Sequence, residues 1–127
     1  MVAPKMPTVL VVEDELLIRL HVADSFRDRG FEVIEAADAV AALSILKANA
    51  RVDAVFSDVS LPGGVDGFAL ARWIRNHRPG VPVVLTSGEV TADHAQAVSR
   101  EEPFFAKPCD YDHVAEFIRQ RLQACGV

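Results

Sequence analysis

The sequence predicts an α/β fold in which a five-stranded parallel sheet is covered by helices on both faces. Two observations lead to this prediction. Short, continuously apolar runs such as Val9–Val12 and Val83–Leu85 recur along the chain, and such runs are typical of parallel strands that are buried on both faces. Helical segments separate the runs, and strands that alternate with helices favour right-handed crossovers and an open, doubly wound sheet.

The first strand–helix unit extends from Val9 to about Arg29. Val9–Val12 is the predicted strand, and a helix begins near Glu15. This helix should bury one stripe of apolar side chains, namely Leu16, Leu20, Ala23 and Phe26. Gly30 follows and fits the helix stop, because glycine readily adopts the left-handed conformation found there.

The second unit begins with an expected edge strand at residues 31–36, where apolar and charged side chains alternate. Asp38 can cap the helix that follows, since a carboxylate accepts hydrogen bonds from the free amides of a first turn. The side chains of this helix that should face inward are Leu43, Leu46 and Ala50.

Three further units complete the pattern. Strands are predicted at Val55–Ser57, Val83–Ser87 and Phe104–Ala106, and helices follow them at Gly67–Arg78, Thr91–Ser99 and Tyr111–Ala124. Asp110 is the expected cap of the last helix. The inward side chains of that helix have the spacing i, i+3, i+4, i+8 and are Val114, Phe117, Ile118 and Leu122.

Length and composition describe an ordinary single domain. The chain has 127 residues, half of them hydrophobic, and no apolar run approaches the roughly 20 residues of a membrane span. We expect a disordered lead over residues 1–7, a domain over 8–124 and a short tail over 125–127. The lead lacks the apolar core of a signal peptide, so a cytoplasmic location is the default. The net charge of −5 argues against non-specific binding of DNA, which depends on neutralising phosphates.

The two cysteines are predicted to be unpaired thiols. Cys109 and Cys125 flank the last predicted helix, whose ends lie about 20 Å apart at the usual rise per residue. A disulfide needs Cα atoms within about 7 Å, so these two residues cannot pair within the chain.

Polar side chains follow four of the predicted strands. Glu13 and Asp14 follow the first, Asp58 ends the third, Ser87 ends the fourth and Lys107 follows the fifth. Each of them alone has an ordinary explanation as a cap, a turn residue or a surface charge. Because the carboxyl ends of parallel strands share one edge, where open α/β sheets bind ligands, we expect these side chains to lie together.

The acids in this group predict a divalent cation. Two carboxylates about 4 Å apart repel each other by about 4 kcal/mol at an effective dielectric constant near 20, and a hard cation removes that cost. Mg²⁺ prefers a few carboxylates, water and a phosphate oxygen. Apart from Cys109, histidine and cysteine are missing from these strand ends, which argues against zinc or copper.

In this order, the set of residues resembles the receiver domains of bacterial two-component response regulators. The similarity covers about Thr8 to Leu122 and includes Asp66-Gly67 at the start of the third helix. The resemblance implies a flavodoxin-like, doubly wound sheet with strand order 2-1-3-4-5 and five helices. Fold similarity alone would not imply a function, but here the complete set of site residues is present.

The resemblance gives each matching residue a role. Asp58 would be the phosphoacceptor and form an acyl phosphate. The ligands of Mg²⁺ would be Glu13, Asp14, Asp58 and the backbone carbonyl of Ser60. Lys107, with an expected cis bond to Pro108, and Ser87 would contact phosphoryl oxygens. Phe104 matches the switch aromatic of the family, and an ordinary core phenylalanine is its alternative explanation.

The chain departs from the family pattern in three places. The turn from Pro62 to Gly67 is one residue longer than usual, which alters the loop beside Asp58 without removing a ligand. The stretch from Ser87 to Lys107 is short, so the fourth helix should be truncated or mobile. Phe104 lacks the hydroxyl of the commoner tyrosine.

The predicted function is a stand-alone phosphoacceptor that is not itself an enzyme. A histidine kinase or histidine phosphotransfer protein would phosphorylate Asp58 and would dock on the first helix, where Arg19 and His21 are expected to point outward. Phosphorylation would then alter a surface made by helix four, strand five and helix five, for a downstream protein or a second receiver. We expect no direct contact with nucleic acid or membrane.

Two other classes of protein are alternatives to a receiver. A phosphohydrolase of the haloacid-dehalogenase type also forms an aspartyl phosphate, but it needs an Asp-x-Asp motif after the first strand, where this chain has Glu13-Asp14-Glu15. A flavodoxin-like carrier of FMN needs a phosphate loop rich in hydroxyls and glycine at that place, and the three acids would repel a phosphate.

Overall fold

The chain folds around a five-stranded sheet in which all strand pairs are parallel, as the sequence predicts. The computed structural model describes residues 6–48, 50–88 and 103–126. The strand order is β2-β1-β3-β4-β5. The strands are β1 (Thr8–Val12), β2 (Glu32–Ala36), β3 (Ala54–Asp58), β4 (Val83–Ser87) and β5 (Phe104–Ala106). The predicted edge position of the second strand is therefore confirmed.

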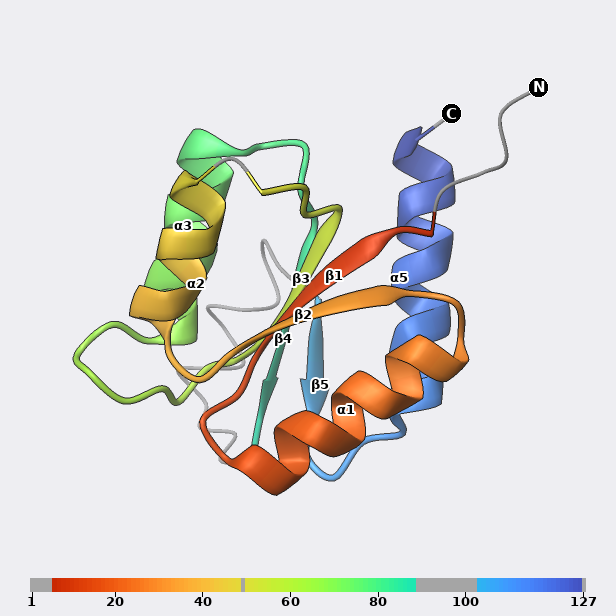
Figure 1. Ribbon diagram of the computed structural model, residues 1–127, viewed down its shortest axis with the longest axis horizontal. Helices are drawn as coiled ribbons and strands as arrows, with labels where there is room; N and C mark the ends of the chain where they lie inside the picture. Colours follow the sequence, from red (N-terminus) through yellow and green to blue (C-terminus); the bar gives the residue numbers. More distant parts are fainter. Residues whose placement is uncertain (1–5, 49, 89–102, 127) are drawn as a thin grey trace.

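Four helices are described, and they cover both faces of the sheet (Figure 1). Their bounds are α1 (Leu16–Asp28), α2 (Ala39–Lys47), α3 (Gly67–His77) and α5 (Tyr111–Gly126). Helices α1 and α5 lie on one side of the sheet and α2 and α3 on the other (Figure 1). The helix predicted at residues 91–99 lies outside the described residues. Among the described helices, none is both long and apolar enough to cross a membrane.

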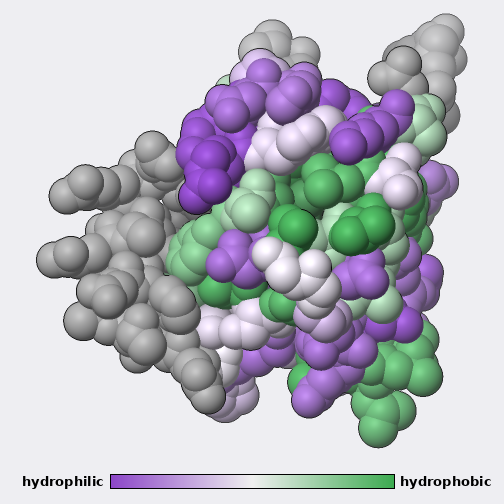
Figure 2. Space-filling model, turned by 90° about the vertical axis from the view of Figure 1, so that its left-hand side faces the viewer, coloured by the Kyte–Doolittle hydropathy of each residue, from purple (hydrophilic) through white to green (hydrophobic). Residues whose placement is uncertain are grey.

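The two faces of β1 divide the core into two layers. Val9 and Val11 pack with α1 and α5, whereas Leu10 and Val12 pack with α2 and α3, because successive strand residues point to opposite faces. All five residues of β1 are buried. This double burial accounts for the continuous apolar run in the sequence. On the outer side of α2 and α3, polar and apolar side chains are mixed, with apolar ones near the centre of the view (Figure 2).

The predicted helix ends are confirmed by their contacts. The Asp38 carboxylate accepts a hydrogen bond from the Ala41 amide at 2.8 Å. The structure adds a cap that was not predicted, because Asp66 caps α3 through the Ala69 amide at 2.9 Å. Asp110 accepts from the Asp112 amide at 3.0 Å. Gly30, after α1, has φ +90°, the left-handed conformation that glycine adopts without strain.

The buried stripe predicted for α1 is half wrong. Ala23 and Phe26 are buried, together with Val22, but Leu16 is 55% exposed and Leu20 is 41% exposed. The first turns of α1 are apolar on both sides, and residues two apart in a helix lie on nearly opposite faces. Periodicity therefore could not decide which apolar side of these turns faces the sheet.

The second helix is shorter than its predicted inward residues implied. Leu46 is buried and Leu43 packs partly against the core, as expected. Ala50, however, lies beyond the end of α2 at Lys47 and is only half-buried. In the last helix, Val114 and Ile118 are buried and Phe117 and Leu122 pack against the same layer of the core, which confirms the predicted stripe.

Candidate functional site

Strand register brings the predicted site residues to one edge of the sheet. Val12 is paired with Ser57, Asp58 with Thr86, and Ser87 with Ala106. The residues at or just after these positions are Glu13, Asp14, Asp58, Ser87 and Lys107. The carboxyl ends of β1, β3, β4 and β5 therefore carry acids, a hydroxyl and an amine side by side, as the sequence predicts.

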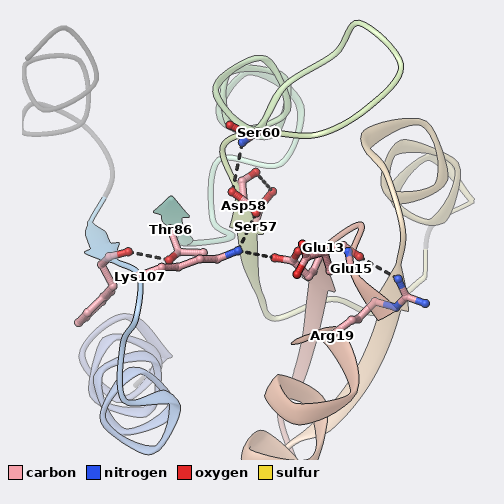
Figure 3. A network of polar contacts seen from close by, with 9 residues as sticks. Glu13, Glu15, Arg19, Ser57, Asp58, Ser60, Thr86 and Lys107 are labelled. Carbon is pink, nitrogen blue, oxygen red and sulfur yellow. Dashed lines mark hydrogen bonds and ion pairs between the residues drawn. The ribbon is translucent and has the colours of Figure 1, made fainter. Parts of the chain in front are cut away.

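Lys107 connects two of the acids (Figure 3). Its Nζ donates to Oδ2 of Asp58 at 2.8 Å and to Oε2 of Glu13 at 3.0 Å. Glu13 is 4% exposed and Asp58 6% exposed. Buried carboxylates are stable only when they are paired, so the ammonium supplies the charge that this edge of the sheet requires.

The pKa values of these groups follow from burial and pairing. Burial raises the pKa of Glu13, and the nearby charge of Asp58 raises it further, against the lowering effect of the Lys107 hydrogen bond. Burial acts to lower the pKa of Lys107, but the hydrogen bonds and charges of Asp58 and Glu13 outweigh burial and raise that pKa. The lysine is therefore held firmly in its charged form.

The turn after β3 fixes the position of the Asp58 carboxylate. Oδ1 accepts a hydrogen bond from the Ser60 amide at 3.2 Å, and the Ser57 hydroxyl donates to the Asp58 carbonyl at 2.9 Å. Helix α3 begins directly against this turn, because the Gly67 amide donates to the Val59 carbonyl at 2.8 Å. A Cβ atom on Gly67 would lie 2.3 Å from the Asp58 carbonyl oxygen, so this close approach requires glycine.

The third acid, Asp14, completes a group that could hold a metal ion. Glu13, Asp14 and Asp58 can each offer one oxygen, and these atoms lie within 4.8 Å of one another. Asp14 is exposed and lines an open hollow with Ser60 and Asp66, so solvent reaches the group from that side. Three carboxylates with access to water are the ligands that Mg²⁺ prefers. The donor set therefore fits the expected cation, and the role of the Ser60 carbonyl stays a prediction.

Ser87 lies at the same edge, whereas Phe104 lies at the start of β5. Ser87 is buried, and its carbonyl accepts from the Lys107 amide at 3.0 Å. The Lys107–Pro108 peptide bond is cis, as expected. Phe104 packs partly buried against the layer of core beneath α2 and α3, and its switching role stays a prediction. Cys109 is a free thiol, and burial raises its pKa.

The side chain of Arg19, beside the site, has an orientation that the sequence did not predict. Arg19 was expected to point outward, but its side chain is 15% exposed and pairs with Glu35 at 3.3 Å. Its Nη1 donates to the Glu13 carbonyl at 2.8 Å (Figure 3). The signal was a single charged side chain within the apolar segment Leu16–Leu20, whose partners come from elsewhere in the fold. His21 is exposed, as expected.

A doubly wound parallel sheet with this set of residues at its carboxyl edge defines the class of phosphoacceptor receiver domains. The model of the response regulator receiver domain family matches residues 9–119. The chain therefore belongs to the response regulator receiver domain family, whose members accept phosphoryl groups in two-component signalling.

Related proteins contain this domain within longer chains. The chain is 33% identical over 119 residues to the sensor kinase CckA of Brucella abortus, a match that covers 91% of this chain and 12% of that protein. It is 32% identical over 118 residues to the nitrogen assimilation regulatory protein NtrX of Azorhizobium caulinodans, covering 91% and 26% respectively. The chain thus spans about an eighth and about a quarter of the lengths of these relatives.

Solved structures confirm the fold. A response regulator receiver protein from Sinorhizobium medicae is similar with a TM-score of 0.86 and 27% identity, covering 94% of this chain and 97% of that chain. The receiver domain of an HD domain-containing protein from Pseudomonas fluorescens has a TM-score of 0.86 and 25% identity, covering 96% and 98%. The predicted family and sheet topology are both confirmed.

Proposed function

We propose that the Asp58 carboxylate accepts a phosphoryl group from the phosphohistidine of a histidine kinase or a histidine phosphotransfer protein. The observation that carries this proposal is the contact of Lys107 with Asp58 at 2.8 Å, at the centre of a carboxylate group that fits Mg²⁺. A fixed cation beside a carboxylate is suited to a site where further negative charge arrives.

The transfer would be a displacement at phosphorus. An oxygen of Asp58 forms the new P–O bond while the P–N bond of the phosphohistidine breaks, and its electron pair remains on the imidazole. The product is an acyl phosphate. Bound Mg²⁺ would neutralise charge between the carboxylates and the phosphoryl oxygens. Lys107 would move from Glu13 to one phosphoryl oxygen, and the Ser87 hydroxyl would hydrogen-bond another.

We assign the Mg²⁺ ligands to Glu13, Asp14, Asp58 and the carbonyl of Ser60. The Lys107 ammonium donates a hydrogen bond to Oε2 of Glu13, and Glu13 is one of the proposed Mg²⁺ ligands. Metal binding and the Glu13–Lys107 ion pair would therefore compete. The role of the chain is that of a signalling phosphoacceptor with at most slow self-dephosphorylation, rather than that of a phosphohydrolase, and its setting is the cytoplasm.

The kinase or phosphotransfer protein is proposed to dock on α1. The outer side of this helix carries three exposed leucines next to the acidic edge: Leu16, Leu17 and Leu20. Apolar side chains in this position suit the helical surface of a phosphodonor protein. The output surface would include β5 and α5, together with the fourth helix predicted from the sequence, and would bind a downstream protein or a second receiver.

The test is phosphorylation by acetyl phosphate in the presence and absence of Mg²⁺, with the modified residue mapped by mass spectrometry. We expect Mg²⁺-dependent uptake of one phosphoryl group at Asp58 and none in Asp58→Asn. Asp24→Asn is the matched control, because Asp24 is an exposed acid of α1. Uptake by Asp58→Asn equal to that of the parent would refute the assignment, and catalytic release of phosphate from the parent would indicate the hydrolase instead.

A further inference from the structure

Arg19 links the acidic turn after β1 to the edge strand of the sheet. Its Nη1 donates to the Glu13 carbonyl at 2.8 Å and its Nε to Oε1 of Glu35 at 3.3 Å. Glu35 lies on β2 and Arg19 on α1. The guanidinium thus connects three separate segments, and it is largely shielded from solvent, with a side chain 15% exposed.

The described polar groups of Glu13 all have partners, and the Arg19 contact completes the set. The Glu13 amide donates to the Ala36 carbonyl at 3.0 Å. The carboxylate accepts from the Glu15 amide at 3.2 Å and from Lys107. Arg19 holds the remaining group, the backbone carbonyl. Because Ala36 follows Glu35 directly, both backbone tethers of Glu13 lead to the same end of β2.

The tethered carbonyl belongs to the peptide unit between Glu13 and Asp14. A peptide unit is planar and contains the Cα atoms of both residues, so holding its oxygen restricts the positions of the two Cα atoms that carry these side chains. Glu13 and Asp14 are two of the three carboxylates that can hold a metal ion. One contact from Arg19 therefore helps to position the backbone of two of the three acids at once.

We propose that Arg19 is a positioning residue for the metal site, acting through the Glu13 carbonyl. This inference rests on the proposed Mg²⁺ site. Partners that orient metal ligands from outside the ligand set typically change metal affinity by about 10- to 100-fold when they are removed. The proposed role is geometric rather than electrostatic, because Arg19 contacts the acidic turn through the Glu13 backbone carbonyl and its charge is paired with Glu35 on β2.

The planar shape of arginine explains why this residue fits. Nη1 and Nε lie in one rigid plane and serve two acceptors on different segments. A lysine has one nitrogen on a flexible stem and cannot reproduce this fork. Arg19→Lys therefore keeps the charge and loses the geometry, which separates a positioning role from a charge effect.

The chain provides a matched control in Arg27. This residue also lies on α1 and pairs with Glu35, through Nη2 at 3.4 Å. Its described backbone contact is with the Val33 carbonyl, not with the acidic turn. Arg27→Met therefore removes an arginine–Glu35 pair of the same kind without touching Glu13.

The experiment is a titration of each folded protein with Mg²⁺ at a temperature well below melting. Amide NMR signals recorded during the titration give the dissociation constant. We expect the dissociation constant for Mg²⁺ to rise about tenfold or more in Arg19→Met and in Arg19→Lys, and to change less than about twofold in Arg27→Met. Thermal melting is measured in parallel. If Arg19 only supports the fold, replacing it lowers the melting temperature but leaves the dissociation constant for Mg²⁺ unchanged.

The possible outcomes distinguish failure of the positioning role from failure of the proposed metal site. Unchanged Mg²⁺ affinity in Arg19→Lys would overturn the positioning role, and Arg19→Lys keeps the test valid if Arg19→Met does not fold. Equal weakening in Arg27→Met would also overturn it, because the effect would then come from the ion pairs of Glu35. A parent protein that does not bind Mg²⁺ would overturn the proposed metal site itself, and this inference with it.

Discussion

The Nζ atom of Lys107 lies 2.8 Å from Oδ2 of Asp58, although strand β4 separates β3 from β5 in the sheet. The lysine side chain thus crosses the end of β4 and joins the two segments on either side of it. The same nitrogen contacts Glu13 after β1. One cation therefore connects the ends of strands β1, β3 and β5, and the proposed Mg²⁺ site would share two of its acids with that cation.

The first prediction concerns this competition. In Lys107→Met, Glu13 and Asp58 lose their charged partner, and unpaired buried groups cost roughly 1 to 3 kcal/mol. We expect a lower melting temperature without metal and tighter Mg²⁺ binding, so that millimolar Mg²⁺ raises the melting temperature more than in the parent. Thermal melts with and without Mg²⁺ measure both effects. Lys47→Met, at an exposed position of α2, is the control, and a smaller Mg²⁺ response in Lys107→Met would contradict the competition.

The second prediction concerns the glycine at the start of α3. The new Cβ in Gly67→Ala would lie 2.3 Å from the Asp58 carbonyl oxygen and 2.8 Å from Val59 Cα. Backbone atoms must then move, and such overpacking typically costs about 1 to 3 kcal/mol. Because the displaced backbone carries Asp58, phosphorylation by acetyl phosphate should fall as well.

The matched control for this substitution is Gly80→Ala. A Cβ atom at Gly80 would meet nothing within 4 Å, so we expect stability and phosphoryl uptake close to those of the parent. Denaturant unfolding and phosphorylation rates measure the two effects. A stable Gly67→Ala protein with the parent's rate of phosphorylation would show that the turn after β3 can relax without cost.

The third prediction concerns docking on α1. Leu17 is 80% exposed, so replacing it by a polar residue should leave folding intact. Leu17→Gln should slow phosphotransfer from the cognate kinase while leaving uptake from acetyl phosphate unchanged. The exposed Val40 of α2 provides the control Val40→Thr, which should affect neither rate. If both rates fall together in Leu17→Gln, the residue supports the site rather than the docking surface.

Much of the site was predictable because its residues follow continuous apolar strands. Asp58 and Ser87 end β3 and β4, whose residues are all buried, so the sequence marks the point at which each strand stops. A parallel sheet then places these ends together whatever the helices do. The caps Asp38 and Asp110 were predictable for the same local reason, since each acts on amides two or three residues later.

The features that were missed depend on contacts between distant segments. Arg19 turns inward because Glu35 of β2 and the Glu13 carbonyl both lie within its reach, and neither partner follows from helical periodicity. Leu16 and Leu20 are exposed for a related reason, because the sheet contacts α1 on the side of Val22 and Phe26. Local patterns predict where a segment begins and ends, whereas the direction of a side chain needs the neighbouring segment.

The last prediction concerns the response of the protein to a phosphoryl group. Ser87 is buried at the end of β4, and its carbonyl already binds the Lys107 amide at 3.0 Å. A phosphoryl group on Asp58 would offer both residues a new acceptor, so the ends of β4 and β5 would have two arrangements of different energy. A ligand shifts such an equilibrium only through this difference in interaction.

We expect beryllium fluoride with Mg²⁺, which mimics the phosphoryl group, to move amide NMR signals in β5 and α5 well beyond the site. In Ser87→Ala the shifts should be confined to the turns around Glu13, Asp58 and Lys107, and Ser44→Ala, at an exposed position of α2, is the control. Long-range shifts of the parent's size in Ser87→Ala would show that the signal reaches β5 and α5 without the hydroxyl.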